Sequence, residues 1–472
     1  MQRNSAQLWG KQGARGALIA GIATVACCLP ATASAVPASQ ALAGTVSPTP
    51  ATGTPTLVNT QATEQIRQLV QCGGTMYAVG TFTEIAWNGT TYTRNNAFSF
   101  SATAPFTVTS WNPNVNGTVN SIAFNGTNCS DAYIGGQFTS VNGTTVANLA
   151  EISTTTGNVV PGFGSHTGGG HVDTLLVVNG HLLAGGTFTS VNGNKGADPY
   201  YASLNPSTGK DDGFLHLNIS GHYTYPGVET NSTDVYNQQL SHGGTLDLVE
   251  GIFTSAGGLH RQQIFMLNVG GTTAKVTGWS SPEFDGSNPS KYPYYYCSVH
   301  HPLYIRTAAW SPDDSTVYIA DTGFHPWNWN GKFPLVGLCD AAAAFPAAQQ
   351  QVTHSWINYT GCDSLYSAAA DSSALYVGGH SRWFHNPDGC NKAGPGAIPA
   401  PGLAGLTPGA SGGALITNSA GTAGLYSRSR GLGADDMLIT SAGLWIASDT
   451  FGGGEQCGGV SGFAGLCFLP SS

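Results

Sequence analysis

A short signature of glycine followed by Phe-Thr recurs along the chain. The clearest copies lie at 133–143 (Tyr-Ile-Gly-Gly-Gln-Phe-Thr-Ser-Val-Asn-Gly) and 183–193 (Leu-Ala-Gly-Gly-Thr-Phe-Thr-Ser-Val-Asn-Gly). Two further copies begin at Tyr77 and Leu248, and degenerate copies begin at Tyr318, Tyr376 and Trp445. Self-similarity at this scale indicates a repeat architecture, in which each unit buries its apolar surface against its neighbours. The sequence therefore predicts seven similar structural units.

Each signature follows a short apolar run that we interpret as its partner strand. These runs are 66–70, 119–124, 172–178, 235–240, 305–310, 365–370 and 436–440. Turn residues, for example Asn125-Gly126, separate each run from its signature, which is the pattern of a β-hairpin. A third strand is expected in most units, as at 148–152 and 201–205, and a fourth near aromatic residues such as Trp111. Four short strands per unit without helical periodicity favour a β-propeller.

The phenylalanines that close the signatures set the size of the unit. They are Phe82, Phe138, Phe188, Phe253, Phe324, Phe384 and Phe451, roughly 50 to 71 residues apart. We expect each to be buried against the next unit, which stabilises the fold by roughly 1.5–3 kcal/mol per side chain.

Ring closure is favoured because an open stack of sheets leaves unpaired backbone groups along its edges. The sequence thus predicts an all-β, seven-bladed β-propeller of four-stranded antiparallel blades, with an open solenoid as the alternative. The last unit stops after its third strand, 463–469. We therefore expect an N-terminal strand at 56–60 to complete blade seven and close the ring.

The repeat Gly-Gly-x-Phe-Thr-x-Val-Asn-Gly resembles the delta-60-type repeat of secreted bacterial β-propellers. The units at 376–383 and 443–450 are similar to the same group, so the resemblance covers nearly the whole chain after the first residues. It implies a propeller fold in a largely uncharacterised family, and it supplies no catalytic residue.

Residues 1–35 have the pattern of a secretory signal. Arg3, Lys11 and Arg15 precede or flank the apolar stretch 17–30, and Ala33-Ser-Ala35 offers a cleavage site. Residues 36–56 are rich in Pro, Thr and Ser and predict a flexible lead-in, which leaves 57–472 as a single propeller domain. Since no later run approaches the ~18 apolar residues of a membrane helix, we expect a secreted, extracellular monomer with no membrane span.

Charge restricts the class of partner. Charged residues make up 9% of the chain and its net charge is −9. With so few Lys and Arg residues to neutralise phosphates, nucleic-acid binding is close to excluded. A surface of Ser, Thr, Asn and aromatic residues suits neutral, hydroxyl-rich ligands, although a generic exported β protein would have the same composition.

Eight cysteines remain after Cys27 and Cys28 of the signal. None has metal-ligand spacing, and an even number in an exported chain indicates disulfides, with 105 possible connectivities. Placed on the propeller, Cys72 and Cys129 occupy the same turn of adjacent blades. We expect 297–339 and 362–390 as further pairs, with 339–362 as the alternative, and a bond between Cys457 and Cys467 in the last blade. No metal or cofactor is expected.

The candidate binding residues lie in loops that emerge on one face of a propeller. Histidine, asparagine and arginine can bond sugar hydroxyls there, and aromatic faces can stack on sugar rings, although surface histidines can also simply cap turns. The predicted ligand-binding residues are His171, Asp173, His301, Tyr304, Arg306, His325, Trp327, His380, Arg382 and Trp383.

Three functions fit this pattern. The first is binding of a neutral or uronate polysaccharide or of a cell surface. The second is catalysis at the same face. A polysaccharide lyase could abstract a proton with the group Tyr304, Arg306, His325, His380 and Arg382. A glycosidase would need two carboxylates ~5–9 Å apart, for which the candidates are Asp173, Asp363 and Asp435. The third is a structural or adhesive surface protein without a small ligand.

Overall fold

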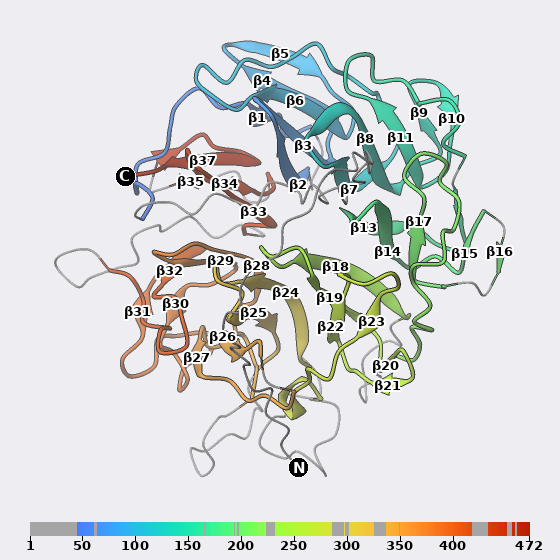
Figure 1. Ribbon diagram of the computed structural model, residues 1–472. Coiled ribbons are helices and arrows are strands. Elements are labelled where there is room, and N and C mark those ends of the chain that lie inside the picture. The colour runs from blue at the N-terminus through green and yellow to red at the C-terminus, as the bar shows by residue number, and fades with distance from the viewer. Residues whose placement is uncertain are drawn as a thin grey trace, which may run out of the picture. The chain divides into compact units, whose positions relative to one another are not determined.

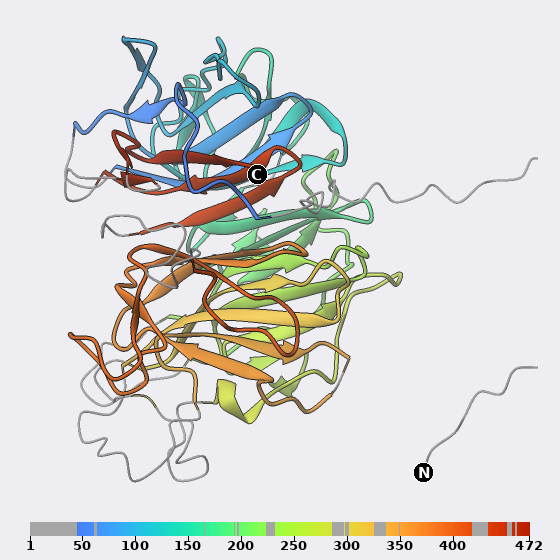
Figure 2. The same cartoon turned by 90° about the vertical axis from the view of Figure 1, so that its left-hand side faces the viewer.

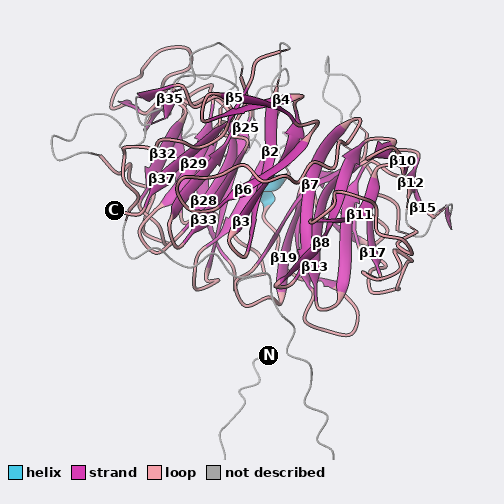
Figure 3. Ribbon diagram, turned by 90° about the horizontal axis from the view of Figure 1, so that it is seen from above, coloured by secondary structure: helices cyan, strands magenta, loops and turns pink. Residues whose placement is uncertain are grey.

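The computed structural model describes residues 45–472, except 61–63, 165, 193, 196–197, 223–231, 286–296, 298–301, 325–336, 349, 418–432, 451–455 and 458–459. The described chain is all-β, as predicted. Its only helical element is one 3₁₀ turn, η1 (Pro282–Phe284), drawn in cyan in Figure 3. Within these residues no helix has the length and apolarity to cross a membrane.

Seven antiparallel main sheets follow one another along the chain, and we number them sheet 1 to sheet 7. Figure 1 shows them arranged around a common centre, with the first strand of each sheet innermost. In order, their strands are β2 (Gln65–Cys72), β3 (Thr75–Thr81) and β6 (Ala97–Ser101); β7 (Thr118–Asn125), β8 (Asn128–Gln137) and β11 (Leu149–Ser153); β13 (Val172–Val178), β14 (His181–Gly186) and β17 (Tyr201–Leu204); β18 (Asp234–Leu240), β19 (Leu246–Ile252), β22 (Ile264–Asn268) and β23 (Lys275–Val276); β24 (Tyr304–Trp310), β25 (Thr316–Thr322), β26 (Ala341–Pro346) and β27 (Trp356–Tyr359); β28 (Leu365–Ala370), β29 (Leu375–Gly379) and β32 (Leu403–Leu406); β33 (Asp436–Thr440), β34 (Gly443–Ala447) and β37 (Leu466–Pro470).

The predicted first strands are all confirmed, and so are the third strands expected at 148–152 and 201–205. The predicted fourth strand is less regular than expected. Sheets 4 and 5 have four strands. Elsewhere the fourth strand is reduced to an isolated bridge, such as Phe100 with Val108 or Ile152 with Val159. The outer segment of these sheets is therefore attached to the third strand by a single bridge and does not form a regular fourth strand.

The repeated Val-Asn-Gly ending folds into a small hairpin of its own beside the main sheet. Asn142 and Gly143 have φ of 44° and 79°, the left-handed geometry that a two-residue hairpin turn requires and that Asn-Gly adopts readily. The small hairpins and their partner strands are β4 (Glu84–Trp87) with β5 (Thr90–Thr93), β9 (Ser140–Val141) with β10 (Thr144–Thr145), β15 (Ser190–Val191) with β12 (Thr167–Gly168) and β16 (Asn194–Lys195), β20 (Ser255–Ala256) with β21 (Leu259–His260), β30 (Trp383–Phe384) with β31 (Ile398–Pro399), and β35 (Gln456–Cys457) with β36 (Val460–Ser461).

The hydrophobic core is divided into clusters, each lying between two consecutive sheets. A further cluster joins sheet 7 to sheet 1 and includes Trp445, Phe468 and Phe82. Five of the signature phenylalanines are buried as expected, but in the opposite direction, and Phe324 is only half-buried. Phe138 of sheet 2 packs with Tyr77 and Val79 of sheet 1, so each contacts the preceding sheet and not the next one. Phe451 lies outside the described residues.

The N-terminal segment lies along the last sheet, but with different residues from those predicted. β1 (Thr56–Leu57) pairs with β4 of the first unit, so the expectation that 56–60 supplies the outer strand of blade seven is wrong. Upstream residues lie beside β37 instead: Val46 bridges Ser471, and the amides of Ser47 and Ala51 donate to Pro470 and Phe468 at 2.7 and 2.9 Å. Figures 1 and 2 show this blue segment next to the red β37.

Four disulfides are formed, and each is one that the sequence predicts. They join Cys72 to Cys129, Cys297 to Cys339, Cys362 to Cys390, and Cys457 to Cys467. The alternative pairing of 339 with 362 is therefore wrong. The first bond connects sheets 1 and 2 at their inner hairpin turns, where it limits how far the two sheets can separate.

Candidate binding cavity

A cavity of about 990 Å³ is enclosed by the first strands of all seven main sheets. β2, β7, β13, β18, β24, β28 and β33 each contribute side chains to its wall. A cavity of this volume is at the upper end of the range found for small-molecule sites in proteins. Because every repeat contributes the same stretch of strand, equivalent positions of the repeats meet at one level of the cavity.

Six of the seven inner strands carry a β-bulge at the same place. The register shifts across Arg67, Asn120, Asp173, Tyr236, Arg306 and Tyr366. A bulged residue stands outside the ladder, and a bulge redirects its side chain. All six line the cavity, and Asp435 occupies the corresponding place immediately before β33. We call these seven residues the cavity ring: Arg67, Asn120, Asp173, Tyr236, Arg306, Tyr366 and Asp435.

The glycine of the repeated signature makes the bulge possible. Gly136 pairs with Val119, directly before the bulge, and a Cβ on Gly136 would lie 2.1 Å from the carbonyl oxygen of Thr118. Gly80, Gly186, Gly251 and Gly379 face the same obstruction at 2.0–2.2 Å. Such contacts are shorter than a side chain tolerates, so these five strands need glycine where they approach the bulge. In sheet 5 the equivalent position is occupied by Asp321.

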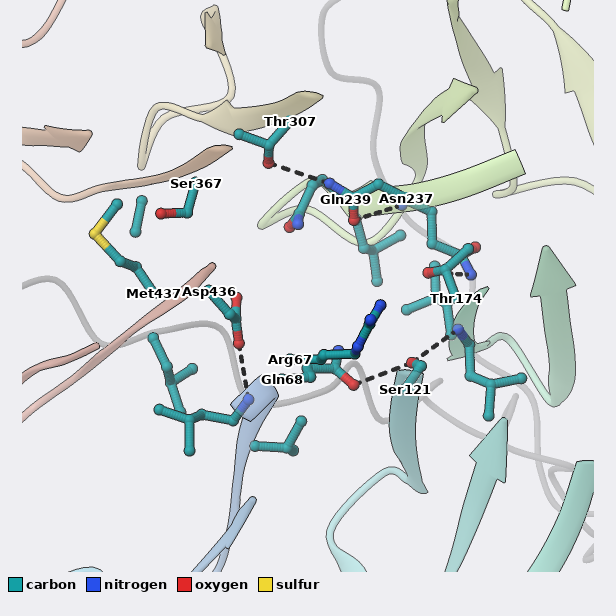
Figure 4. A pocket seen from close by; sticks show the side chains of 18 of the residues that line it. Arg67, Gln68, Ser121, Thr174, Asn237, Gln239, Thr307, Ser367, Asp436 and Met437 are labelled. Atoms are coloured by element: carbon teal, nitrogen blue, oxygen red, sulfur yellow. Dashed lines mark hydrogen bonds between the residues drawn. The ribbon is translucent and has the colours of Figure 1, made fainter. Parts of the chain in front are cut away.

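The polar residues that directly follow the ring residues in the sequence link neighbouring sheets across the cavity wall. Gln68 Oε1 accepts from Ser121 Oγ at 3.0 Å, and Asn237 Nδ2 donates to Thr307 Oγ1 at 3.1 Å. The carboxylate of Asp436 accepts from the amide of Leu69 at 2.8 Å and so joins sheet 7 to sheet 1. Figure 4 shows these bonds around the cavity, with Arg67 projecting into it. These links hold the ring residues at fixed relative positions.

The acidic part of the ring is a hydrogen-bonded cluster. Asp173 Oδ1 accepts from Asn120 Nδ2 at 2.8 Å, and Asp173 Oδ2 lies 3.1 Å from His171 Nε2. Asp173 also shares a side-chain hydrogen bond with Asp234; burial and this neighbouring carboxylate raise the pKa of Asp234 well above its ordinary value. The bond to Asp173 raises the pKa of His171. Burial and the adjacent carboxylate therefore favour the protonated form of Asp234.

The opposite part of the ring is aromatic and cationic. The Arg306 guanidinium lies 5.9 Å from the ring centre of Tyr236 and 5.3 Å from that of Tyr366. The hydroxyl of Tyr236 donates to the carbonyl of Ile305, and Tyr366 Oη lies 3.3 Å from His380 Nδ1. Burial raises the pKa of both tyrosines, so they are neutral hydroxyls at physiological pH. This half of the ring offers a cation between two aromatic rings.

The structure divides the sequence-predicted site residues into groups. His171, Asp173, Tyr304 and Arg306 lie at or beside the ring, and His380 reaches it through Tyr366. His301, His325 and Trp327 lie outside the described residues.

Arg382 and Trp383 belong to a different cluster. The Arg382 guanidinium makes a two-pronged ion pair with Asp363, with N···O distances of 2.6–3.1 Å, and lies 4.6 Å from the ring centre of Trp383. Asp363 is 1% exposed, and the same guanidinium approaches the carbonyl of Cys390. This arrangement fixes the loop that carries the Cys362–Cys390 bond, and neither Arg382 nor Trp383 lines the cavity.

Sequence reasoning missed four ring members, Arg67, Asn120, Tyr236 and Tyr366, as well as the neighbouring Asp234. A signal for them was present. In six of the seven units a β-branched residue or leucine is followed by the ring residue and then by Gln, Ser, Thr or Asn, as in Val172-Asp-Thr and Ile305-Arg-Thr; the seventh reads Ala434-Asp-Asp. Aligning the inner strands on this triplet would have assembled the ring. No group of three His, Cys, Asp or Glu residues suited to a metal ion occurs in the described part of the chain.

No family model matches the chain, and no curated protein sequence resembles it. Among solved structures it is similar to the WD40 β-propeller domain of Doa1, with 10% identity over 88% of this chain and 96% of that one, at a TM-score of 0.41. It is also similar to Saccharomyces cerevisiae Sqt1, with 8% identity, coverage of 89% and 99%, and a TM-score of 0.43. The β-propeller domain of Myceliophteria thermophila Cps50 (Swd1) matches at 9% identity, with coverage of 66% and 78% and a TM-score of 0.36. Likenesses at this level carry no information about what this chain binds.

Proposed function

We propose that this chain is a secreted, monomeric, seven-bladed β-propeller that binds carbohydrate in its central cavity. The cyclic order of contacts between first strands, including β2 with β33, supports a closed ring. The segment Val46–Ala51 beside β37 would complete the last blade. Its repeat resembles the delta-60-type repeat, and the four disulfides suit an oxidising compartment outside the cytoplasm.

The observation that carries the binding proposal is the cavity ring. Seven side chains, one from each sheet, meet at equivalent positions, and they combine guanidinium and amide donors, carboxylate acceptors and tyrosine hydroxyls. A sugar presents alternating hydroxyl donors and acceptors around an apolar ring, and it is bound by such mixed polar groups next to aromatic faces. A purely structural propeller would have no need for bulges that aim residues of four different polar types into the cavity.

A glycosidase is not favoured by the carboxyl groups. Asp173 is engaged by Asn120 and His171, whereas the two groups of a glycosidase must flank the scissile bond ~5–9 Å apart. Asp363, the second of the three candidates, is held in its ion pair with Arg382 and does not line the cavity, whereas the third, Asp435, does line it.

A polysaccharide lyase is the second candidate, and one observation favours it. Tyr366 contacts both Arg306 and His380, with the guanidinium over the tyrosine ring and the hydroxyl against the imidazole. An arginine that neutralises a uronate carboxylate beside a Tyr–His pair is a suitable set for proton abstraction and β-elimination.

The test is a binding screen of the full chain against neutral and acidic glycans, repeated with Asp173→Asn and Tyr236→Phe. We expect both substitutions to weaken binding of any retained glycan by at least tenfold while the protein stays folded. Binding that is unchanged in both variants would place the site elsewhere. Incubation with uronate polymers, followed by absorbance of the unsaturated product in the ultraviolet, separates lysis from binding.

A further inference from the structure

The five arginines in the described residues fall into two groups. Arg94 donates to the carbonyls of Thr93 and Thr109, Arg261 to those of His260 and Thr277, and Arg382 to the carboxylate of Asp363. These three fasten loops to the sheets. Arg67 and Arg306 donate no hydrogen bond within the described part of the chain, and both are exposed in the cavity.

The carboxylates of the cavity wall are used differently. Of its four aspartates, at least three have protein partners: Asp173 is engaged by His171 and Asn120, Asp234 by Asp173, and Asp436 by the amide of Leu69. His242 also lines the cavity, and its Nδ1 lies 3.1 Å from the carboxylate of Asp314. At least three of the four cavity carboxylates are thus engaged by the protein, whereas the Arg67 and Arg306 guanidinium groups donate no hydrogen bond to the described residues.

Arg306 is nevertheless held in place. It lies over the rings of Tyr236 and Tyr366, and cation–π contacts on two sides restrict a guanidinium without consuming its N–H donors. Arg67 stands on the bulge of β2, close enough to the acidic cluster that its charge acts against the protonation of His171. Both guanidinium groups therefore lie at the level of the ring with their hydrogen-bond donors unused.

We propose that the carbohydrate bound by the cavity carries carboxylate groups, which Arg67 and Arg306 take up. This inference rests on the proposed function and specifies its ligand class. A guanidinium matches a carboxylate with two parallel N–H···O bonds, which a neutral sugar cannot provide. The chain has a net charge of −9 and would repel a densely charged polyanion. A short uronic-acid oligosaccharide therefore suits the site better than a heavily sulfated or phosphorylated polymer.

The experiment is isothermal titration calorimetry of the full chain with three probes: a uronic-acid oligosaccharide, the same oligosaccharide with its carboxyl groups reduced to alcohols, and a sulfated glycan of similar length. Arg67→Gln and Arg306→Gln are compared with Lys210→Gln, which removes the same charge from an exposed position outside the cavity. Arg67→Lys and Arg306→Lys keep the positive charge but remove the planar guanidinium with its paired N–H donors. They replace the glutamine variants in the comparison if either glutamine variant does not fold.

We expect each arginine-to-glutamine change to weaken binding of the uronic-acid probe by at least tenfold, and Lys210→Gln by less than twofold. The lysine variants should fall in between, and the reduced probe should bind at least tenfold more weakly than the acidic one to the unaltered chain. Equal binding of acidic and reduced probes would overturn this inference and leave carbohydrate binding standing. Preference for the sulfated probe would also overturn it. Failure of every glycan to bind would overturn both proposals.

Discussion

A side chain on Gly136 would place its Cβ 2.1 Å from the carbonyl oxygen of Thr118. This proximity connects the most visible feature of the sequence with the cavity. In five of the sheets the signature glycine allows its strand to approach the bulged first strand, and the bulge in turn presents a ring residue to the cavity.

Gly136→Ala should therefore destabilise the protein and disturb Asn120, the ring residue on the adjacent bulge. We expect a loss of about 1–3 kcal/mol in the free energy of unfolding, the usual cost of forcing extra atoms into a packed interior. Gly74→Ala is the control, because nothing lies within 4 Å of a Cβ there. Chemical denaturation of both variants provides the measurement, and equal stabilities would contradict the account of the glycine.

Leu57→Ala should lower stability by about 2–5 kcal/mol, as is usual for truncation of a buried leucine. Leu57 is 4% exposed and packs in the cluster that joins the first and last sheets. Leu259→Ala, at a leucine that is 41% exposed, should change stability little. If the two variants melt at the same temperature, the N-terminal segment does not hold these sheets together.

Stability should fall as the pH rises from about 4 to about 7. Burial raises the pKa of Asp247 to about 7 and that of Asp436 to about 6, above the ~3.9 of an unfolded aspartate. In this window the folded chain binds more protons than the unfolded one, so increasing pH favours unfolding. Urea midpoints at pH 5 and pH 8 test the sign, and a higher midpoint at pH 8 would refute it.

Asp247→Asn should flatten this pH dependence. Asparagine keeps an acceptor for the hydroxyl of Tyr201, which now donates to Asp247 Oδ2 at 2.9 Å, but it removes the buried ionisable group. We expect the variant to be more stable than the unaltered chain at pH 8 and similar to it at pH 5.

Asp321→Asn should stabilise the protein at pH 8 by on the order of 1–3 kcal/mol, the typical cost of an unsatisfied buried polar group. Asp321 stands where five other repeats have the glycine of the bulge. Its side chain is fully buried, and burial together with Asp340 raises its pKa well above the ordinary value. The exposed Asp388→Asn is the control. A lower melting temperature for the Asp321 variant would show that the carboxyl group has a stabilising contact.

The strands could be predicted because turn chemistry and apolar runs are local features. Asn142 and Gly143 identify a hairpin wherever they occur together between strands. The disulfides followed from placing Cys72 and Cys129 in equivalent turns, which requires only the repeat and the order of the units.

The direction in which Phe138 packs could not be predicted, because both neighbouring sheets offer the same kind of apolar surface. The N-terminal partner of β37 was also misplaced. Val46 stands among Pro, Thr and Ser residues without periodicity, and Thr56–Leu57 looked more like a strand. Only the packing of the two chain ends shows that the segment at Val46, and not Thr56–Leu57, lies beside β37.

Part of the ring could not be predicted because side chains in a regular strand alternate between its two faces. A residue such as Tyr236 or Tyr366 in a regular ladder would point into the interface between sheets, and its sequence neighbours give no warning. The bulge changes that direction, and a bulge arises from the meeting of two strands. His171 and Asp173 were found because their side chains have obvious chemistry, not because their geometry was foreseen.

Since each ring residue stands outside the ladder of its strand, its identity is nearly independent of the scaffold. A single exchange at one of these seven places alters what the interior recognises while the backbone pairing beside it persists. The architecture therefore lends itself to diversification: a library randomised at these positions alone should yield many folded members with different ligand preferences.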